Sequence, residues 1–199
     1  MKGKKKKILF FTLLSVAIIL ILFWSIGLFR LWTKGIASVA DDTHTFNDKK
    51  SHILNGESSI AIDLSKLESN IGKELYNDGH HKIYVSWIHK TSEGYEIFFR
   101  SCGQYSISKA TLISGIQHVT LNEKESTDLI TAKMKAHYNG KSYISTWSKL
   151  GGINFKDGDE FSFYIFPYNA YETKEVTLDE EGIVYLSVTN LYKNIWSKN

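Results

Sequence analysis

The chain has 199 residues, of which 43% are hydrophobic and 14% aromatic, and its formal net charge is +3. Seven of the 24 basic residues lie before residue 35, where there is no acid, so the remainder has 17 bases against 21 acids. A slightly acidic remainder gives no basic surface for nucleic acid, so no nucleic-acid partner is expected. The single cysteine, Cys102, excludes an intramolecular disulfide, and no N-glycosylation sequon is present. Both features favour a bacterial envelope over the eukaryotic secretory route.

The N-terminus combines a lysine cluster with an uncharged, mostly apolar run at residues 8–29. A helix of this length spans about 33 Å, which is enough for a hydrocarbon core of about 30 Å. Because Lys and Arg mark the cytoplasmic end of a span, we expect residues 1–7 to be a cytoplasmic tail and residues 8–29 a single transmembrane helix. The run exceeds the apolar core of a cleaved signal. The sequence therefore predicts an uncleaved anchor in the cell membrane, with the C-terminal domain extracellular.

The segment 11–15, with the sequence FTLLS, resembles the start of a type IV pilin or pseudopilin. In that family the leader ends in a glycine, and a glutamate follows the apolar start of the mature chain. Here Phe10 stands in place of the glycine and Ser15 in place of the glutamate. The family's properties are therefore not assigned to this chain, and a pseudopilin-like assembly subunit is the last of the alternatives.

The next segment, residues 30–57, is polar and without periodicity, so we expect a stalk or linker there. Residues 58–199 are expected to form one extracytoplasmic β-rich domain. Alternation over 59–65 predicts a strand, whereas the four-residue spacing of Leu67, Ile71 and Leu75 predicts a short helix over 66–76. Two strand-like runs, 82–90 and 95–103, predict a hairpin.

The clearest strand signal lies at residues 130–144, where apolar and polar residues alternate on both sides of Asn139-Gly140. This dipeptide favours a two-residue type I′ turn, which would place Tyr138 opposite Lys141 and Ala136 opposite Tyr143. Further strands are expected over 110–121, 159–169 and 175–190. The predicted fold is therefore mostly β: an N-terminal transmembrane helix, then an antiparallel β-sandwich or barrel-like domain with one short helix.

Few residues in the sequence indicate a catalytic or metal-binding role. The loop residues Asp78, His80 and His81 are candidate metal ligands, and the acids of residues 157–160 are candidate calcium ligands, although both groups are also ordinary turn residues. Cys102 lies in a strand without a surrounding nucleophile motif. No catalytic residue, metal site or cofactor is assigned, and the sequence favours a non-enzymatic role.

Aromatic side chains are numerous, and the hydrophobic core accounts for part of them. Some strands carry large apolar groups on both faces, which favours a covering partner. The residues expected to bind a ligand are Trp87, Tyr143, Trp147, Tyr164 and Tyr168. We expect a membrane-anchored binding or interaction module of a bacterial envelope, whose partner is an envelope protein or a glycan. An envelope-acting hydrolase and a cell-wall or carbohydrate-binding domain are the alternatives.

Overall fold

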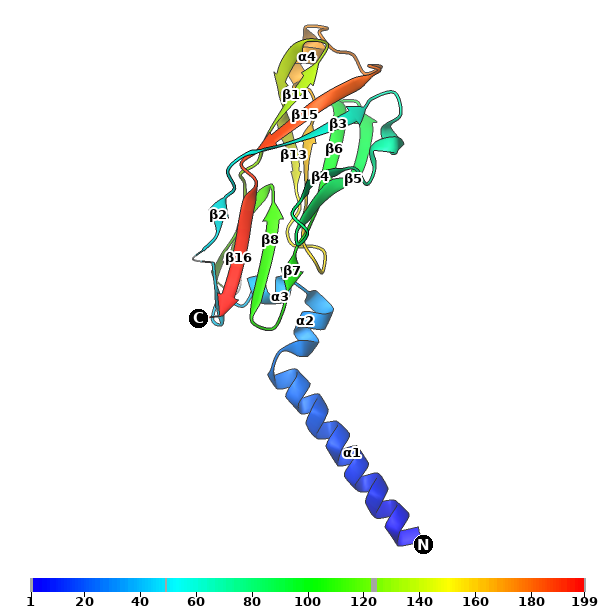
Figure 1. Ribbon diagram of the computed structural model, residues 1–199, viewed down its shortest axis with the longest axis vertical. Coiled ribbons are helices and arrows are strands. Elements are labelled where there is room, and N and C mark those ends of the chain that lie inside the picture. The colour runs from blue at the N-terminus through cyan, green and yellow to red at the C-terminus, as the bar shows by residue number, and fades with distance from the viewer. Residues whose placement is uncertain (1, 49, 123–124, 199) are drawn as a thin grey trace.

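The computed structural model describes residues 2–48, 50–122 and 125–198. Helix α1 (Lys2–Ser25) projects from one end of an elongated β-rich body (Figure 1). Every strand pair within these described ranges is antiparallel. The prediction of a mostly β, antiparallel fold with few helices is confirmed.

The predicted transmembrane segment is not one straight helix. Gly27 adopts a left-handed conformation with φ of 76°, and the chain resumes as α2 (Leu28–Lys34), bent by 65° from α1. No single helix in the described ranges is long and apolar enough to cross a membrane, but Leu9–Ser25 and Leu28–Lys34 together pass by length and composition. The structure thus leaves a transmembrane helix over 8–29 unconfirmed.

The distal half of the body, farther from α1, contains two facing sheets. Their inward side chains, among them Met134, Leu186, Ile97 and Phe163, form one hydrophobic cluster. The first sheet has the order β12 (Lys141–Ile144), β11 (Lys133–Tyr138), β15 (Ile183–Thr189) and β3 (Glu57–Asp63). The second has the order β13 (Thr146–Leu150), β14 (Glu160–Tyr164), β6 (Gly94–Cys102), β5 (Lys82–Thr91) and β4 (Glu74–Asn77).

Both predicted hairpins are present. In β11–β12, Tyr138 pairs with Lys141 and Ala136 with Tyr143, and both turn residues, Asn139 and Gly140, have positive φ as a type I′ turn requires. In β5–β6, Thr91 pairs with Gly94, so that turn is tighter than expected. The strand predicted over 59–65 is β3, and the run 110–121 divides at Gly115 into two strands.

One local prediction is wrong. The helix expected over 66–76 is only a 3₁₀ turn, η1 (Leu67–Asn70), followed by β4. The turn closes around the buried Asn70, whose side chain accepts from the Asp63 backbone N–H and donates to the Asp63 and Leu67 carbonyls. These bonds replace helical ones. The segment 175–190 supplies a single strand, β15, and the helix α4 (Tyr168–Glu172) lies near the distal end (Figure 1).

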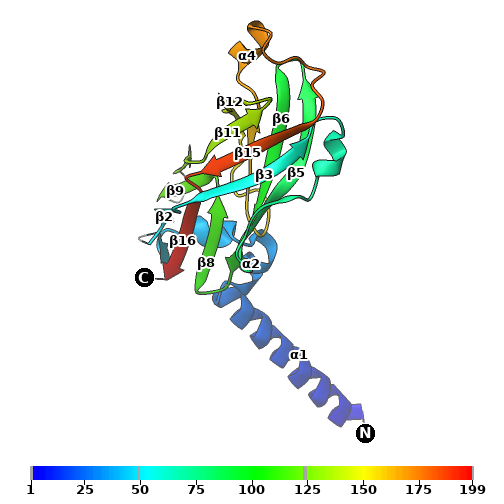
Figure 2. The same ribbon diagram turned by 45° about the horizontal axis from the view of Figure 1, so that its top comes forward.

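The proximal half, next to α2 (Figure 2), contains one five-stranded and one two-stranded sheet. In one, β16 (Tyr192–Lys198) pairs with β1 (Phe46–Asn47), β2 (His52–Ile53) and β8 (Lys109–Ser114), and β8 pairs with β7 (Gln104–Tyr105). In the other, β9 (Ile116–Asn122) pairs with β10 (Glu125–Ile130).

Part of the segment expected to be a stalk is packed against the proximal half. Ile36, Val39 and Ala40, at and within α3 (Ala37–Ala40), join Phe46 and Trp196 in a second, smaller hydrophobic cluster. The Ile36 N–H also donates to the Lys156 carbonyl at 2.7 Å. Residues 36–46 are therefore held on the body, which a stalk prediction based on their polarity did not anticipate.

Candidate functional site

The five aromatic residues predicted to bind a ligand fall into three environments. Trp87, Trp147 and Tyr168 are each more than half exposed. Tyr164 is half-buried, and its hydroxyl donates to Glu93. Tyr143 is buried, and its ring packs edge-to-face on Phe166 with centroids 5.3 Å apart, so this ring belongs to the core.

The two exposed tryptophans do not form one platform. Trp87 pairs with Phe98 on β6, whereas Trp147 pairs with Phe163 on β14. Directly paired residues project to the same face of a sheet, and Phe163 belongs to the core face. Trp147 therefore lies at the edge of the inner face, and Trp87 lies on the outer one.

A shallow pocket of about 510 Å³ lies at the distal end, between β12 and the segment that starts α4. Ile144, the exposed end residue of β12, is 72% accessible, and Tyr168 of α4, the neighbour of Pro167, is 67% accessible. The Lys141 ammonium and the Glu175 carboxylate form an ion pair at 3.1 Å. The pocket is lined by Lys141, Ser142, Tyr143, Ile144, Pro167, Asn169 and Glu175. We call this pocket with Tyr168 the distal tip.

A buried charged network lies in the proximal half. The His118 imidazole lies between two carboxylates, with Nδ1 at 2.7 Å from Asp128 and Nε2 at 2.6 Å from Asp159. Ser114 donates to the same oxygen of Asp159 at 2.6 Å, and Asn194 accepts the backbone N–H of His118 at 2.9 Å. The network thus connects β8, β9, β10 and β16 to the start of β14.

The network keeps His118 protonated. Burial opposes the positive charge, but hydrogen bonds to Asp128 and Asp159 outweigh this effect and raise the pKa of His118 to about 9. With both ring nitrogens donating, the imidazolium has no lone pair to act as a base. Ser114 donates to Asp159 and not to His118, so the geometry differs from that of a Ser-His-Asp triad.

Of the three candidate metal ligands, Asp78 and His81 bond to each other, and the His80 ring lies 3.2 Å from the Gln104 amide nitrogen. Asp78 Oδ2 lies 2.9 Å from His81 Nδ1, and His81 Nε2 lies 2.8 Å from the Thr111 hydroxyl. Burial works against ionisation of Asp78, but bonds from His81 and from the backbone N–H groups of His80 and His81 hold its pKa well below the ordinary value. No group of three His, Cys, Asp or Glu residues suited to a metal occurs in the described ranges.

The acids of residues 157–160 point to different partners. Asp157 pairs with Arg100, Asp159 with His118, and Glu160 accepts from Ser86 at 2.6 Å. They therefore do not converge as calcium ligands do. Burial and the nearby Asp157 carboxylate raise the pKa of the Cys102 thiol to about 11, so at neutral pH it is not the thiolate that nucleophilic chemistry requires.

Sequence inspection missed the His118 network. Its members are separated by up to 80 positions, and only folding brings them together. The available signal was His118 among the β-branched residues of β9, whereas β16 is largely polar and aromatic, so Asn194 does not stand out there. Comparisons with protein-family models, with curated proteins and with solved structures give no significant match.

Proposed function

We propose that the chain is a single-pass, membrane-anchored binding module of a bacterial cell envelope, which binds an envelope protein or a glycan through the distal tip. In this arrangement the lysine-rich N-terminus is cytoplasmic and the β-rich body is extracellular. Residues 58–199 carry the binding function. Residues 8–29 form the anchor, which crosses the bilayer with α1 and reaches its outer surface at the bend before α2.

The charge and hydropathy of the first residues support the anchor. The two apolar helix segments, Leu9–Ser25 and Leu28–Lys34, have together the length and composition of a span. The lysine cluster lies on one side, as expected for a cytoplasmic end. Trp24 and Trp32 are about 70% exposed at the other end, where aromatic rings favour the headgroup layer.

The observation that carries the binding proposal is the exposure of Ile144 and Tyr168 beside the pocket between β12 and α4. Helix α4 lies at the end opposite α1 (Figure 1). An anchored module meets its partner most freely at the surface that is farthest from the bilayer. Large exposed apolar and aromatic side chains around a concave site are typical of binding surfaces. The Lys141–Glu175 pair adds polar groups that fix the orientation of a ligand.

A hydrolase is the less favoured alternative. His118 has both nitrogens on carboxylates, and the Cys102 thiol has a raised pKa. The Ser114 hydroxyl, which bonds to Asp159 in the same network, is fully buried. A binding module requires none of these groups to react.

In-cell photo-crosslinking of the full-length protein tests the proposal. A photoreactive amino acid is placed at Tyr168 or Ile144, and the attached molecules are identified by mass spectrometry. We expect one dominant adduct from both positions. The same probe at Ile53, which is also about half exposed but lies on β2 in the proximal half, should not give that adduct.

A photoreactive residue at Trp87 tests whether the partner binds at the distal tip or on the outer face of β5. An adduct at Trp87 and not at Tyr168 would move the binding surface to the outer face of β5 and contradict the distal tip. Equal adducts at Ile53, Trp87 and Tyr168 would indicate collisions without a binding site. Protease added to intact cells tests the topology, because an extracellular body is cleaved and an intracellular one is protected.

A further inference from the structure

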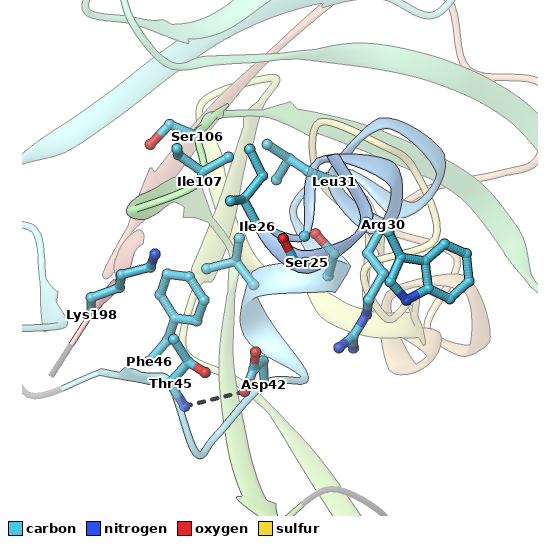
Figure 3. A pocket seen from close by; sticks show the side chains of 14 residues that line it. Ser25, Ile26, Arg30, Leu31, Asp42, Thr45, Phe46, Ser106, Ile107 and Lys198 are labelled. Atoms are coloured by element: carbon cyan, nitrogen blue, oxygen red, sulfur yellow. Dashed lines mark hydrogen bonds between the residues drawn. The ribbon is translucent and has the colours of Figure 1, made fainter. Parts of the chain in front are cut away.

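A second cavity, of about 660 Å³, lies where α1 meets the body. Figure 3 shows it between the helix bend at Ser25 and Ile26, the start of β1 at Phe46, and the loop at Ser106 and Ile107. The cavity lies at the C-terminal end of the apolar helix α1. If α1 is anchored in a bilayer, as proposed above, this cavity lies at the level of the lipid headgroups.

Two cations flank the cavity from opposite sides, Arg30 of α2 and Lys198 of β16 (Figure 3). Neither forms an ion pair with a residue that the structure describes. The lining contains one acid, Asp42, whose Oδ1 already accepts the Thr45 N–H at 3.1 Å. The net charge of the lining is therefore positive, which complements an anion.

The remaining lining suits an amphiphile. The Thr45 side chain adds a hydroxyl to the lining, whereas the hydroxyls of Ser25 and Ser106 already donate to the backbone carbonyls of Leu22 and Lys109. Leu31 and Ile107 supply apolar surface, and Ile107 is 44% exposed. A lipid phosphate with its glycerol and upper acyl chain presents the same succession of charged, polar and apolar groups. Arg and Lys near a membrane surface are well placed to bind anionic headgroups.

Here we propose that this cavity binds the phosphate of an anionic glycerophospholipid from the outer leaflet, with Arg30 and Lys198 as its two cationic contacts. This inference rests on the proposed membrane anchor. It assigns the cavity a role that the distal tip does not have: bound lipid holds the proximal half against the bilayer and directs the distal tip away from it.

Native mass spectrometry of the full-length chain, released from lipid nanodiscs, tests the inference. The discs contain equal amounts of phosphatidylglycerol and phosphatidylcholine, and the readout is the ratio of the two lipids retained. We expect phosphatidylglycerol enrichment, reduced about fivefold by Arg30→Gln or by Lys198→Gln, because one basic residue near the surface contributes about 1 kcal/mol. Lys133→Gln is the matched control, since Lys133 is an exposed lysine on β11 in the distal half.

The N-terminal lysines attract anionic lipid in the other leaflet, but this background is the same in every variant. If phosphatidylglycerol enrichment falls equally in Arg30→Gln, Lys198→Gln and Lys133→Gln, the enrichment comes from general surface charge. That result would overturn the proposed site. In discs of phosphatidylcholine alone, added inorganic phosphate should not bind. Phosphate binding that Arg30→Gln abolishes would make this a free-anion site and also overturn the proposal.

The same experiment separates this inference from the anchor on which it rests. A chain that does not enter nanodiscs would overturn both. A chain that inserts but shows no phosphatidylglycerol enrichment above that of the double variant Arg30→Gln/Lys198→Gln would overturn the lipid site alone and leave the anchor intact.

Discussion

In the distal half, two sheets bury aromatic and aliphatic side chains such as Phe99, Phe161 and Phe166 against each other. In the proximal half, a smaller cluster around Trp196 lies beside the buried ions His118 and Asp159. Apolar burial is insensitive to pH and contributes about 25 cal/mol per Å². A buried ion pair depends on protonation and on both partners being present. The two halves should therefore respond differently to the same perturbation.

The largest effect is expected from Phe161→Ala in the distal cluster. Phe161 is 2% exposed, and its ring lies 5.5 Å from that of Phe99. The substitution leaves a cavity and should lower the free energy of unfolding by about 3–5 kcal/mol. Urea unfolding of the full chain in detergent measures this loss. A loss under about 1 kcal/mol would show that the two sheets are not tightly packed there.

The next effect is a pH dependence that originates in the proximal half. The folded-state pKa of His118, about 9, lies above the ordinary value of 6.5. Its stabilisation is therefore complete below pH 6.5 and is lost as the pH rises through about 9. The free energy of unfolding should fall by about 3 kcal/mol across this window.

The control for this pH dependence is a second histidine. His118→Gln should flatten the profile between pH 6.5 and 9, whereas His137→Gln, at an exposed position on β11, should preserve it. Parallel profiles for the wild type and His118→Gln would contradict a charged His118 in the folded state. Urea unfolding at several pH values supplies the data.

A smaller, local effect is expected from Gly35→Ala. Gly35 has φ of 61°, and an added Cβ would lie 1.9 Å from the Lys156 carbonyl oxygen. The docked segment 36–46 should then detach, with amide exchange at least about tenfold faster, which corresponds to about 1.4 kcal/mol. The distal core should keep its unfolding midpoint. Hydrogen-exchange mass spectrometry measures both.

Gly72→Ala separates backbone strain from the clash, because Gly72 also has positive φ, 86°, but nothing lies within 4 Å of an added Cβ. This variant should leave exchange in residues 36–46 unchanged. Faster exchange there in both variants would show that the segment is not held by the contact with Lys156.

The smallest effect is expected from Trp87→Ser. Trp87 is 51% exposed on the outer face of β5, outside both clusters. Substitution at such a surface site should change the free energy of unfolding by no more than about 0.5 kcal/mol. A destabilisation above about 1 kcal/mol in the urea experiment would place the indole in a packed environment.

Local signals predicted local structure. The Asn139-Gly140 turn and the alternation on either side determined the β11–β12 register residue by residue, because turn geometry and pleat period act over a few positions. The prediction of a helix over 66–76 was wrong, because the apolar four-residue spacing on which it rested covers only a short segment. Asn70 instead closes a turn through bonds to Asp63 and Leu67, which the spacing does not reveal.

The candidate site was predictable only in part. The sequence analysis named five aromatic residues as ligand contacts, and one of them, Tyr168, is exposed beside the distal pocket. The sequence did not separate Tyr143, which packs on Phe166, from exposed Trp87, because both lie in strands with similar neighbours. Which side of an aromatic strand is covered depends on the facing sheet.

Period, turn chemistry and composition were enough to predict the antiparallel β class, the two hairpins and the contrast between an apolar, lysine-flanked N-terminus and a slightly acidic remainder. The docking of residues 36–46 on the body and the position of His118 between Asp128 and Asp159 are visible only in the folded chain. Those contacts join residues far apart in the chain. Their energy comes from shared burial and paired charge, which no single segment contains.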